Sequence, residues 1–416
     1  MVLKKGVAIL ATASLTAGLL TGCGNGKDSQ DKNKVIEVAT QSPLSGGSAT
    51  LGDSIKLGAQ MELENQKADF KKLGFDLKLV PYDDQGDPTK GVSNAEQIAA
   101  DTSILGVVGH LNSGVAIPSS LKYEKAHIPM VSPANTATEV TDRGLSSVNR
   151  ICARDDFQGP AEANYAVNTL KAKNIYIIQD KTAYGTGLAD AFKDAAAKLG
   201  AKIVGYEGIT VGEKDFNGVI NNIATKKPDL VFFGGLYAEG GLIIKQAADK
   251  GLQMPFMGGD GLDSSTLVEI AGDAVKNVYY TSVAADALKV AGGQEFANQF
   301  KKEFNKNIES YSAYGYDSMG VILQGIKNAI KDNNNKMPSR EEVEKAVRDI
   351  QDYNGVVTKV GFDEKGDNKF AKVHIYHLMK QNILENKLTK SLSKKQILKG
   401  VSLLVVSLFT KSRYGI

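Results

Sequence analysis

The chain has 416 residues, 42% of them hydrophobic and 23% charged, a composition typical of a soluble globular protein. Its net charge of +3 is unevenly distributed, because residues 23–376 carry a net charge of −6 and residues 377–416 one of +7. An acidic body argues against nucleic acid as the partner, and the length allows two or three domains.

The beginning of the chain predicts export. Two lysines precede an apolar run over 6–20, the order found in secretory signal peptides. This run is too short to cross a bilayer, which takes about 20 residues. The sequence LTGC, which ends at Cys23, resembles the lipobox of bacterial lipoproteins. We therefore expect a signal peptide over 1–22, a lipid on Cys23 and a flexible tether over 23–34, which would hold the protein on the extracytoplasmic face of the cell membrane. An ordinary secretory signal is the alternative.

Strand-like and helix-like runs alternate through the body. Strands are predicted over 35–40, 75–84, 104–109, 128–133, 174–180, 201–209, 229–235, 255–261 and 277–284. Helices are predicted over 55–66, 89–100, 115–126, 187–199, 216–225, 240–250, 294–304, 312–331 and 343–350, with a Gly/Ser-rich loop over 42–54 and a β-hairpin over 355–376. This order is typical of doubly wound α/β units, and its length predicts two lobes.

Two polar loops follow the neighbouring strands predicted over 104–109 and 128–133. The first loop contains Ser113 and the second Thr136, and both hydroxyls can donate or accept hydrogen bonds. Open α/β sheets bind ligands at the carboxyl ends of their strands, where the free N–H groups of a following helix suit a carboxylate. Helix capping is the alternative role for such residues. Because two adjacent loops share this chemistry, the sequence predicts a ligand site.

Motifs of common catalytic sites are missing from the sequence. It has no GxxxxGK[ST] phosphate loop, no GxSxG elbow and no zinc spacing among its four histidines. No nucleophile stands beside a base in any recognisable motif. We therefore expect no enzyme activity, no cofactor and no metal site. The second cysteine, Cys152, is expected to be an inert buried thiol outside any disulfide.

The body resembles bacterial periplasmic-type binding proteins for branched-chain amino acids, which serve ABC importers. The resemblance rests on YDDQGDP (82–88), GHLNS (109–113), SPANTAT (132–138), DDFQGP (155–160), DKTAYGTG (180–187), GITVGEKDF (208–216), GGLYAEGG (234–241) and FMGGDG (256–261). It implies the type 1 periplasmic-binding-protein architecture, two Rossmann-like lobes joined by three crossover segments. Lobe 1 would comprise 35–154 and 285–352, and lobe 2 would comprise 155–284 and 353–376.

The resemblance also implies a function. A monomeric lipoprotein would capture leucine, isoleucine or valine as its lobes close, and would present it to ABC permease subunits in the membrane. A surface-tethered amino-acid sensor on the same fold is the alternative. The ligand carboxylate would meet Ser113 and Thr136, and the ammonium the Ala134 carbonyl, Thr136 and Asp260. Asp155 would lie at the hinge near the α-substituents. The ligand side chain would be surrounded by Leu51, Leu111, Asn112, Tyr184, Leu236 and Tyr311.

The chain departs from the familiar enteric members in several places. It lacks their disulfide, whose positions correspond to Gly86 and Asn112, and it has Asp260 where they have Glu. Leu51 and Leu236 replace aromatic residues, which leaves another small apolar amino acid as an alternative ligand. The basic tail over 377–416 is expected to lie outside the fold. Read-through or a frameshift past the normal stop is our favoured account of it, and a basic amphipathic anchor is the alternative.

Overall fold

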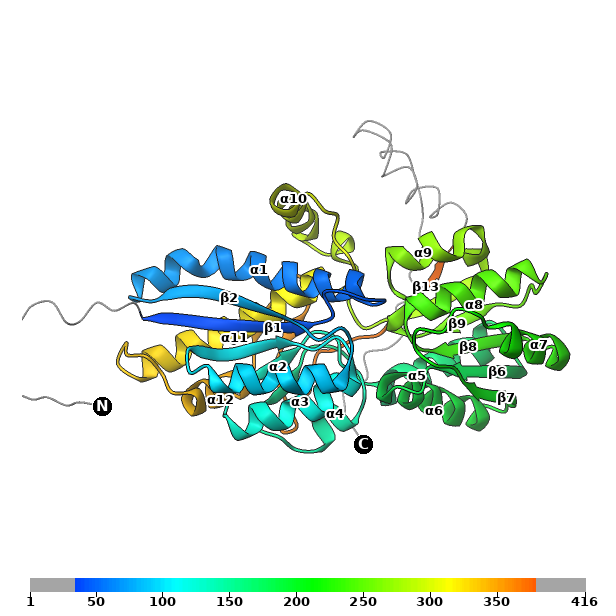
Figure 1. Ribbon diagram of the computed structural model, residues 1–416, viewed down its shortest axis with the longest axis horizontal. Helices are drawn as coiled ribbons and strands as arrows, with labels where there is room; N and C mark the ends of the chain where they lie inside the picture. The colour runs from blue at the N-terminus through cyan, green and yellow to red at the C-terminus, as the bar shows by residue number, and fades with distance from the viewer. Residues whose placement is uncertain (1–33, 379–416) are drawn as a thin grey trace, which may run out of the picture.

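Two mainly parallel sheets, one in each of two lobes, carry the fold (Figure 1). The structure is a computed structural model, and it describes residues 34–378. The first lobe contains a parallel sheet in the order β2-β1-β3-β4-β5, formed by β1 Val35–Ser42, β2 Asp76–Asp83, β3 Ile104–Gly109, β4 Met130–Ser132 and β5 Val148–Arg150. The second has the order β13-β10-β9-β8-β6-β7, formed by β6 Asn174–Gln179, β7 Lys202–Gly208, β8 Leu230–Gly234, β9 Phe256–Gly258, β10 Val278–Ser282 and β13 His374–Leu378.

Helices cover both faces of each sheet. The helices of the first lobe are α1 Ala49–Lys72, α2 Pro88–Ala100, α3 Ser113–Lys125, α4 Glu139–Asp142, α10 Gly293–Phe304, α11 Ser312–Asp332 and α12 Arg340–Arg348. Those of the second lobe are α5 Asp155–Asn164, α6 Ala183–Lys198, α7 Asn217–Lys226, α8 Tyr237–Asp249 and α9 Ser265–Ala271, with a π-helical turn over Tyr165–Thr169. Inner parallel strands such as β3 and β8 are buried along their whole length and read as nearly continuous apolar runs, whereas the edge strands β2 and β7 are partly exposed. The predicted two-lobed, doubly wound α/β fold is confirmed.

The Gly/Ser-rich loop before α1 is shorter than predicted. The prediction of a loop over 42–54 is wrong in its second half, because α1 begins at Ala49. Glycine is used there for close packing: a Cβ on Gly52 would lie 1.9 Å from the Pro43 carbonyl oxygen, and one on Gly58 would lie 1.9 Å from that of Ser312. The early start of the helix places Leu51 in its first turn, facing the second lobe.

The predicted hairpin over 355–376 is also wrong. A turn exists where it was expected, since the Gly366 N–H donates to the Asp363 carbonyl, but only an isolated bridge pairs Phe362 with Asn368. The chain instead forms a small ribbon from β11 Tyr353–Asn354 and β12 Lys359–Val360, and β13 then pairs antiparallel with β10. The last strand therefore pairs with β10, which is distant in the sequence, and not with the neighbouring arm of the predicted hairpin.

The lobe assignment changes with this correction. The Asp317 carboxylate on α11 accepts hydrogen bonds from the backbone N–H groups of Val356, Val357 and Thr358, so this segment packs on the first lobe. Asp367 is likewise bound to Arg150 of β5. Within 353–376, only the stretch that enters β13 joins the sheet of the second lobe.

The basic tail begins later than expected. β13 continues through Leu378, and the His377 ring stacks on Tyr279 with centroids 4.1 Å apart, so the first two residues assigned to the tail belong to the sheet. The predicted signal peptide, the Cys23 lipidation site and the rest of the tail lie outside the described residues. Within 34–378, no helix has the length and apolarity needed to cross a membrane.

Candidate functional site

The two polar loops of the first lobe lie side by side and are fastened by Asn135. Its Nδ2 donates to the Leu111 carbonyl at 2.9 Å, while its Oδ1 accepts from the His110 N–H at 3.0 Å and from the Ser132 hydroxyl at 2.8 Å. The Ala137 N–H also reaches Oγ of Ser113 at 3.4 Å. The predicted adjacency of the loops is therefore observed, and each side chain in this clamp is fully buried or nearly so.

A small pocket between these loops and the second lobe encloses about 280 Å³ of empty space, part of which is open solvent. Its walls combine apolar side chains with one carboxylate, and they are formed by Leu51, Leu111, Asn112, Ala134, Tyr184, Leu236, Asp260, Gly261 and Tyr311. All of these except Gly261 were predicted to contact a ligand. The first lobe contributes through α1, the β3–α3 loop, the loop after β4 and the start of α11. The second contributes through α6, α8 and the segment after β9.

Asp260 is held by three neutral donors. Its Oδ1 accepts from Nε2 of Gln158 at 2.8 Å and from the Tyr184 hydroxyl at 2.9 Å, and its Oδ2 accepts from the Tyr311 hydroxyl at 2.5 Å. The Tyr184 hydroxyl in turn accepts from the Gly261 N–H at 2.9 Å. Burial raises the pKa of Asp260, and the three donors oppose that rise. The carboxylate is fixed in orientation, but no side-chain cation within residues 34–378 pairs with it.

Asp155 is a second buried acid, at the first position of α5 and beside the pocket wall. It is 2% exposed, and neither of its carboxylate oxygens forms a hydrogen bond. Burial, reinforced by the charge of Asp260, raises the pKa of Asp155 to about 8. The nearby Thr136 hydroxyl opposes this rise without a hydrogen bond of normal geometry, and it too is buried and unpartnered. The Asp155 carboxylate and the Thr136 hydroxyl can therefore form hydrogen bonds that no described residue provides.

The charge of Arg150 lowers the pKa of Asp155 but does not neutralise this acid. Arg150 is fully buried, but its guanidinium is committed to Asp367 at 2.6 Å and to the carbonyls of Asn135 and Ala137 at 2.9 and 2.8 Å. Buried charges are stable only when they are paired. The site can therefore accept a positively charged group, while the N–H groups in the first turn of α3 can take an anionic one.

Ser113 and Asn112 mark the start of α3. Asn112 is the N-cap residue, yet its side chain makes no capping bond and its Oδ1 is buried and unpartnered. A Cβ placed on Gly86 would lie 3.4 Å from that Oδ1, so the positions of the missing disulfide are neighbours in space. Here the Asp84 carboxylate and the His110 ring, 3.3 Å apart, link these two loops without a covalent bond.

Several residues of the site were not singled out in the sequence. Gln158 orients Asp260, and Asn135 fastens the loops, although both stand inside the motifs DDFQGP and SPANTAT. Glu162 lies two turns after Asp155 on α5 and accepts from Thr281 at 2.6 Å, and its burial raises its pKa well above the usual range. The i, i+3, i+7 spacing of Asp155, Gln158 and Glu162 was the available signal, because it places all three on one helix face.

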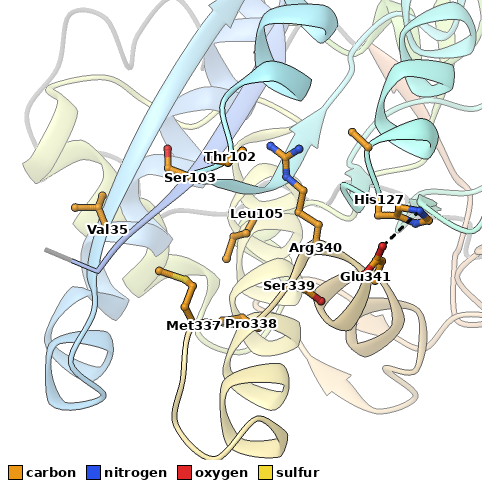
Figure 2. A pocket seen from close by; sticks show the side chains of 11 residues that line it. Val35, Thr102, Ser103, Leu105, His127, Met337, Pro338, Ser339, Arg340 and Glu341 are labelled. Carbon is orange, nitrogen blue, oxygen red and sulfur yellow. Dashed lines mark ion pairs between the residues drawn. The ribbon is translucent and has the colours of Figure 1, made fainter. Parts of the chain in front are cut away.

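A larger hollow, with about 680 Å³ of empty space on the same measure, lies at the opposite end of the first sheet (Figure 2). It is bordered by the start of β1, the segment before β3 and the start of α12. Its one arginine, Arg340, donates to backbone carbonyls, including those of Ile104 and Ala99. His127 pairs with Glu344 at 2.8 Å and lies 3.8 Å from Glu341. These polar groups are already partnered, so the hollow is a weaker candidate than the pocket between the lobes.

The part of the chain that the structure describes contains no cluster of three or more His, Cys, Asp or Glu residues suited to a metal ion. Cys152 is buried and free, and its thiol lies 3.4 Å from the Asn135 carbonyl oxygen. Burial raises the pKa of this thiol far above its usual range, which makes it unreactive.

Comparisons with known proteins identify relatives that span the same body. Residues 35–382 match the family model described as periplasmic binding protein. The Leu/Ile/Val-binding protein homolog 1 of Brucella abortus is 36% identical over 335 residues, which cover 80% of this chain and 88% of that protein. An amino acid binding protein of Pseudomonas aeruginosa is 34% identical over 377 residues, covering 90% and 95% of the two chains.

Solved structures share the same fold. The leucine binding protein LivK of Thermotoga maritima matches with a TM-score of 0.75 and 26% identity, covering 83% of this chain and 96% of that one. The branched-chain amino acid transporter substrate binding protein LivJ of Streptococcus pneumoniae, solved with isoleucine, matches with a TM-score of 0.75, 24% identity and the same coverage. The chain therefore belongs to the periplasmic binding protein family, with the Leu/Ile/Val-binding proteins among its relatives.

Proposed function

We propose that this protein captures a branched-chain amino acid between its two lobes and delivers it to an ABC importer. The observation that carries this proposal is the pocket between the lobes, which combines uncompensated buried acids with helix-start donors and an apolar wall. A free amino acid has the matching chemistry: one cation, one anion and a side chain.

Each part of the ligand has a proposed partner. The carboxylate meets Ser113, Thr136 and the free N–H groups at the start of α3. The ammonium meets the Ala134 carbonyl, Thr136 and the acidic side formed by Asp260 and Asp155. Leu51, Leu111 and Leu236, with the rings of Tyr184 and Tyr311, enclose the side chain. An apolar wall of this kind favours leucine, isoleucine or valine over polar amino acids.

Calorimetric titration tests the proposal. We expect leucine, isoleucine or valine to bind, and sugars and dipeptides to give no heat of binding. A leucine analogue without the ammonium, 4-methylpentanoate, is the matched control, and it should bind at least 30-fold more weakly because both buried acids lose their counter-charge. Tight binding of a sugar without binding of any amino acid would contradict the proposed function.

We also propose that the protein is anchored to the membrane through a lipid on Cys23, on the extracytoplasmic face, where it meets the permease as a monomer. The LTGC sequence and the apolar run before it support this placement. Cys23→Ala should leave the protein unprocessed or release it from the membrane fraction, whereas Cys152→Ala should not change its fractionation. A Cys23→Ala protein that is still processed and membrane-bound would overturn the lipid assignment.

A further inference from the structure

A contact between the lobes lies outside the ligand pocket, at the start of α1. The Thr50 hydroxyl is 3.0 Å from the Thr266 hydroxyl on α9, and the Thr50 N–H donates to the Tyr237 hydroxyl on α8 at 3.3 Å. In Figure 1 the dark-blue start of α1 reaches toward α8 in the second lobe. Neither Thr50, Thr266 nor Tyr237 borders the pocket.

A second pair of contacts flanks the first. The Ser310 hydroxyl donates to the Asp263 carbonyl at 2.8 Å, and the Glu309 carboxylate accepts from the Ser265 N–H at 3.2 Å. Glu309 and Ser310 immediately precede α11 and belong to the first lobe. All these bonds join the first lobe to the second.

We propose that these residues, Thr50, Tyr237, Thr266, Asp263, Ser265, Glu309 and Ser310, form a latch that sets ligand affinity by stabilising the closed cleft. The inference rests on the proposed function, and it adds residues that act without touching the amino acid. A protein that binds tightly only when closed has an apparent affinity proportional to its closed fraction. Each latch bond is made only in the closed form, so it raises that fraction.

The Thr50–Thr266 pair gives the sharpest test, because valine has the shape of threonine without its hydroxyl. Thr50→Val and Thr266→Val should each weaken leucine binding about three- to tenfold, the effect of one net hydrogen bond. The double variant should weaken it little further, because both single changes remove the same bond. Thr225→Val, which removes an intrahelical bond of 2.9 Å to the Asn221 carbonyl on the exposed α7, is the control and should bind as the wild type does.

Two further measurements separate a latch from a pocket residue or a folding defect. A latch variant should weaken leucine, isoleucine and valine binding by the same factor, and it should leave the melting temperature of the unliganded protein within about 2 °C. Unchanged affinity, a changed leucine-to-valine ratio or additive effects of the two substitutions would overturn the latch. If the wild type binds no amino acid, the proposed function fails, whereas a wild type that binds leucine and variants that bind it equally tightly reject the latch itself.

Discussion

The Tyr311 hydroxyl donates a hydrogen bond of 2.5 Å to Oδ2 of Asp260 and thereby joins the two lobes inside the pocket. Tyr311 comes from the start of α11 in the first lobe, and Asp260 follows β9 in the second. Burial raises the pKa of Tyr311 well above its usual range, so its hydroxyl remains a neutral donor. The bond orients a carboxylate without neutralising its charge, which leaves that charge for a ligand cation.

Asp260→Asn should separate ligand binding from stability. Asparagine keeps an oxygen for the donors Gln158 and Tyr184, and the Tyr311 hydroxyl can rotate to accept from the new amide. We therefore expect the unliganded protein to lose less than about 1 kcal/mol of unfolding free energy, while affinity for leucine falls by about 2–5 kcal/mol. Calorimetry and urea denaturation of this single variant measure both quantities.

The control for that experiment is Asp190→Asn, a surface acid that pairs with Lys193 on α6, and it should change neither quantity. Unchanged leucine affinity in Asp260→Asn would remove this carboxylate from the site and leave the ammonium to Thr136, the Ala134 carbonyl and Asp155.

Asp155 should make the unliganded protein less stable as the pH rises. Its native pKa of about 8 lies above the ordinary aspartate pKa of 3.8, so between these values the folded protein holds a proton that the unfolded chain has released. The free energy of unfolding must then fall from about pH 4 to pH 8. Urea denaturation of wild type and Asp155→Asn across this range measures the effect, and the variant should show the smaller decline.

Ligand binding should depend on pH in the opposite direction. An ammonium group favours ionised Asp155, so binding releases a proton below pH 8, and affinity should rise by up to about tenfold per pH unit. The other titratable groups around Asp155 are Asp260 after β9, Asp156 and Glu162 on α5 and Tyr184 on α6, and Arg150 adds a constant positive charge. Glu162→Gln is the control that should keep the rise, whereas a rise that persists unchanged in Asp155→Asn would assign the proton to another group.

The end of β13 at Leu378 shows where the tail can be removed without disturbing the sheet. Truncation after Gln381 keeps the pairing of β13 with β10, and we expect the melting temperature and leucine affinity to stay within experimental error of the wild type. Truncation after Ile375 is the matched control. It removes the stacking of Tyr376 on Tyr280 and of His377 on Tyr279, so the melting temperature should fall by several degrees. A similar loss on truncation after Gln381 would show that the tail packs on the body.

The alternation of apolar strands and amphipathic helices could be predicted because each element depends on the pattern of residues within its own segment. The run over 104–109 coincides with β3, and the helix predicted over 312–331 differs from α11 only at its last residue. The resemblance to binding proteins supplied the pocket residues, eight of which meet between the lobes. Periodicity alone supplied only Ser113 and Thr136, because side chains on different lobes meet through tertiary structure.

The errors have a common physical cause, which is long-range pairing. The two arms of the expected hairpin form only an isolated bridge with each other. Instead, the Asp317 carboxylate accepts hydrogen bonds from the N–H groups after Gly355, and His374–Leu378 pair with β10. Gln158 was overlooked because its role depends on Asp260, 102 residues away in the chain. Neither partner can be inferred from the spacing of residues within one segment.

Asp367, in the turn of the incorrectly predicted hairpin, is a buried acid whose removal should cost far more stability than removal of an exposed acid. Its carboxylate accepts from Arg150 Nε at 2.6 Å and from Arg154 Nη1 at 2.9 Å, and Arg150 is fully buried. Burial alone would raise the pKa of Asp367, but the two guanidinium groups outweigh it and lower that pKa. Its contribution to stability is therefore present above the unfolded value near pH 4, and it is lost as the pH falls through the native pKa.

Asp367→Ala leaves the Arg150 guanidinium buried without its counter-charge, and we expect a loss of about 3–5 kcal/mol in unfolding free energy at pH 7. Asp352→Ala is the control, since Asp352 pairs with Lys359 on the surface at 2.8 Å and should cost less than about 1 kcal/mol. Arg150 also holds the carbonyls of Asn135 and Ala137, so leucine affinity should fall together with stability. Urea denaturation measures the unfolding free energy of the two variants, and calorimetry measures their leucine affinity. If Asp367→Ala lost no more unfolding free energy than Asp352→Ala, the loop that carries Thr136 would be held by Asn135 without help from the buried ion pair.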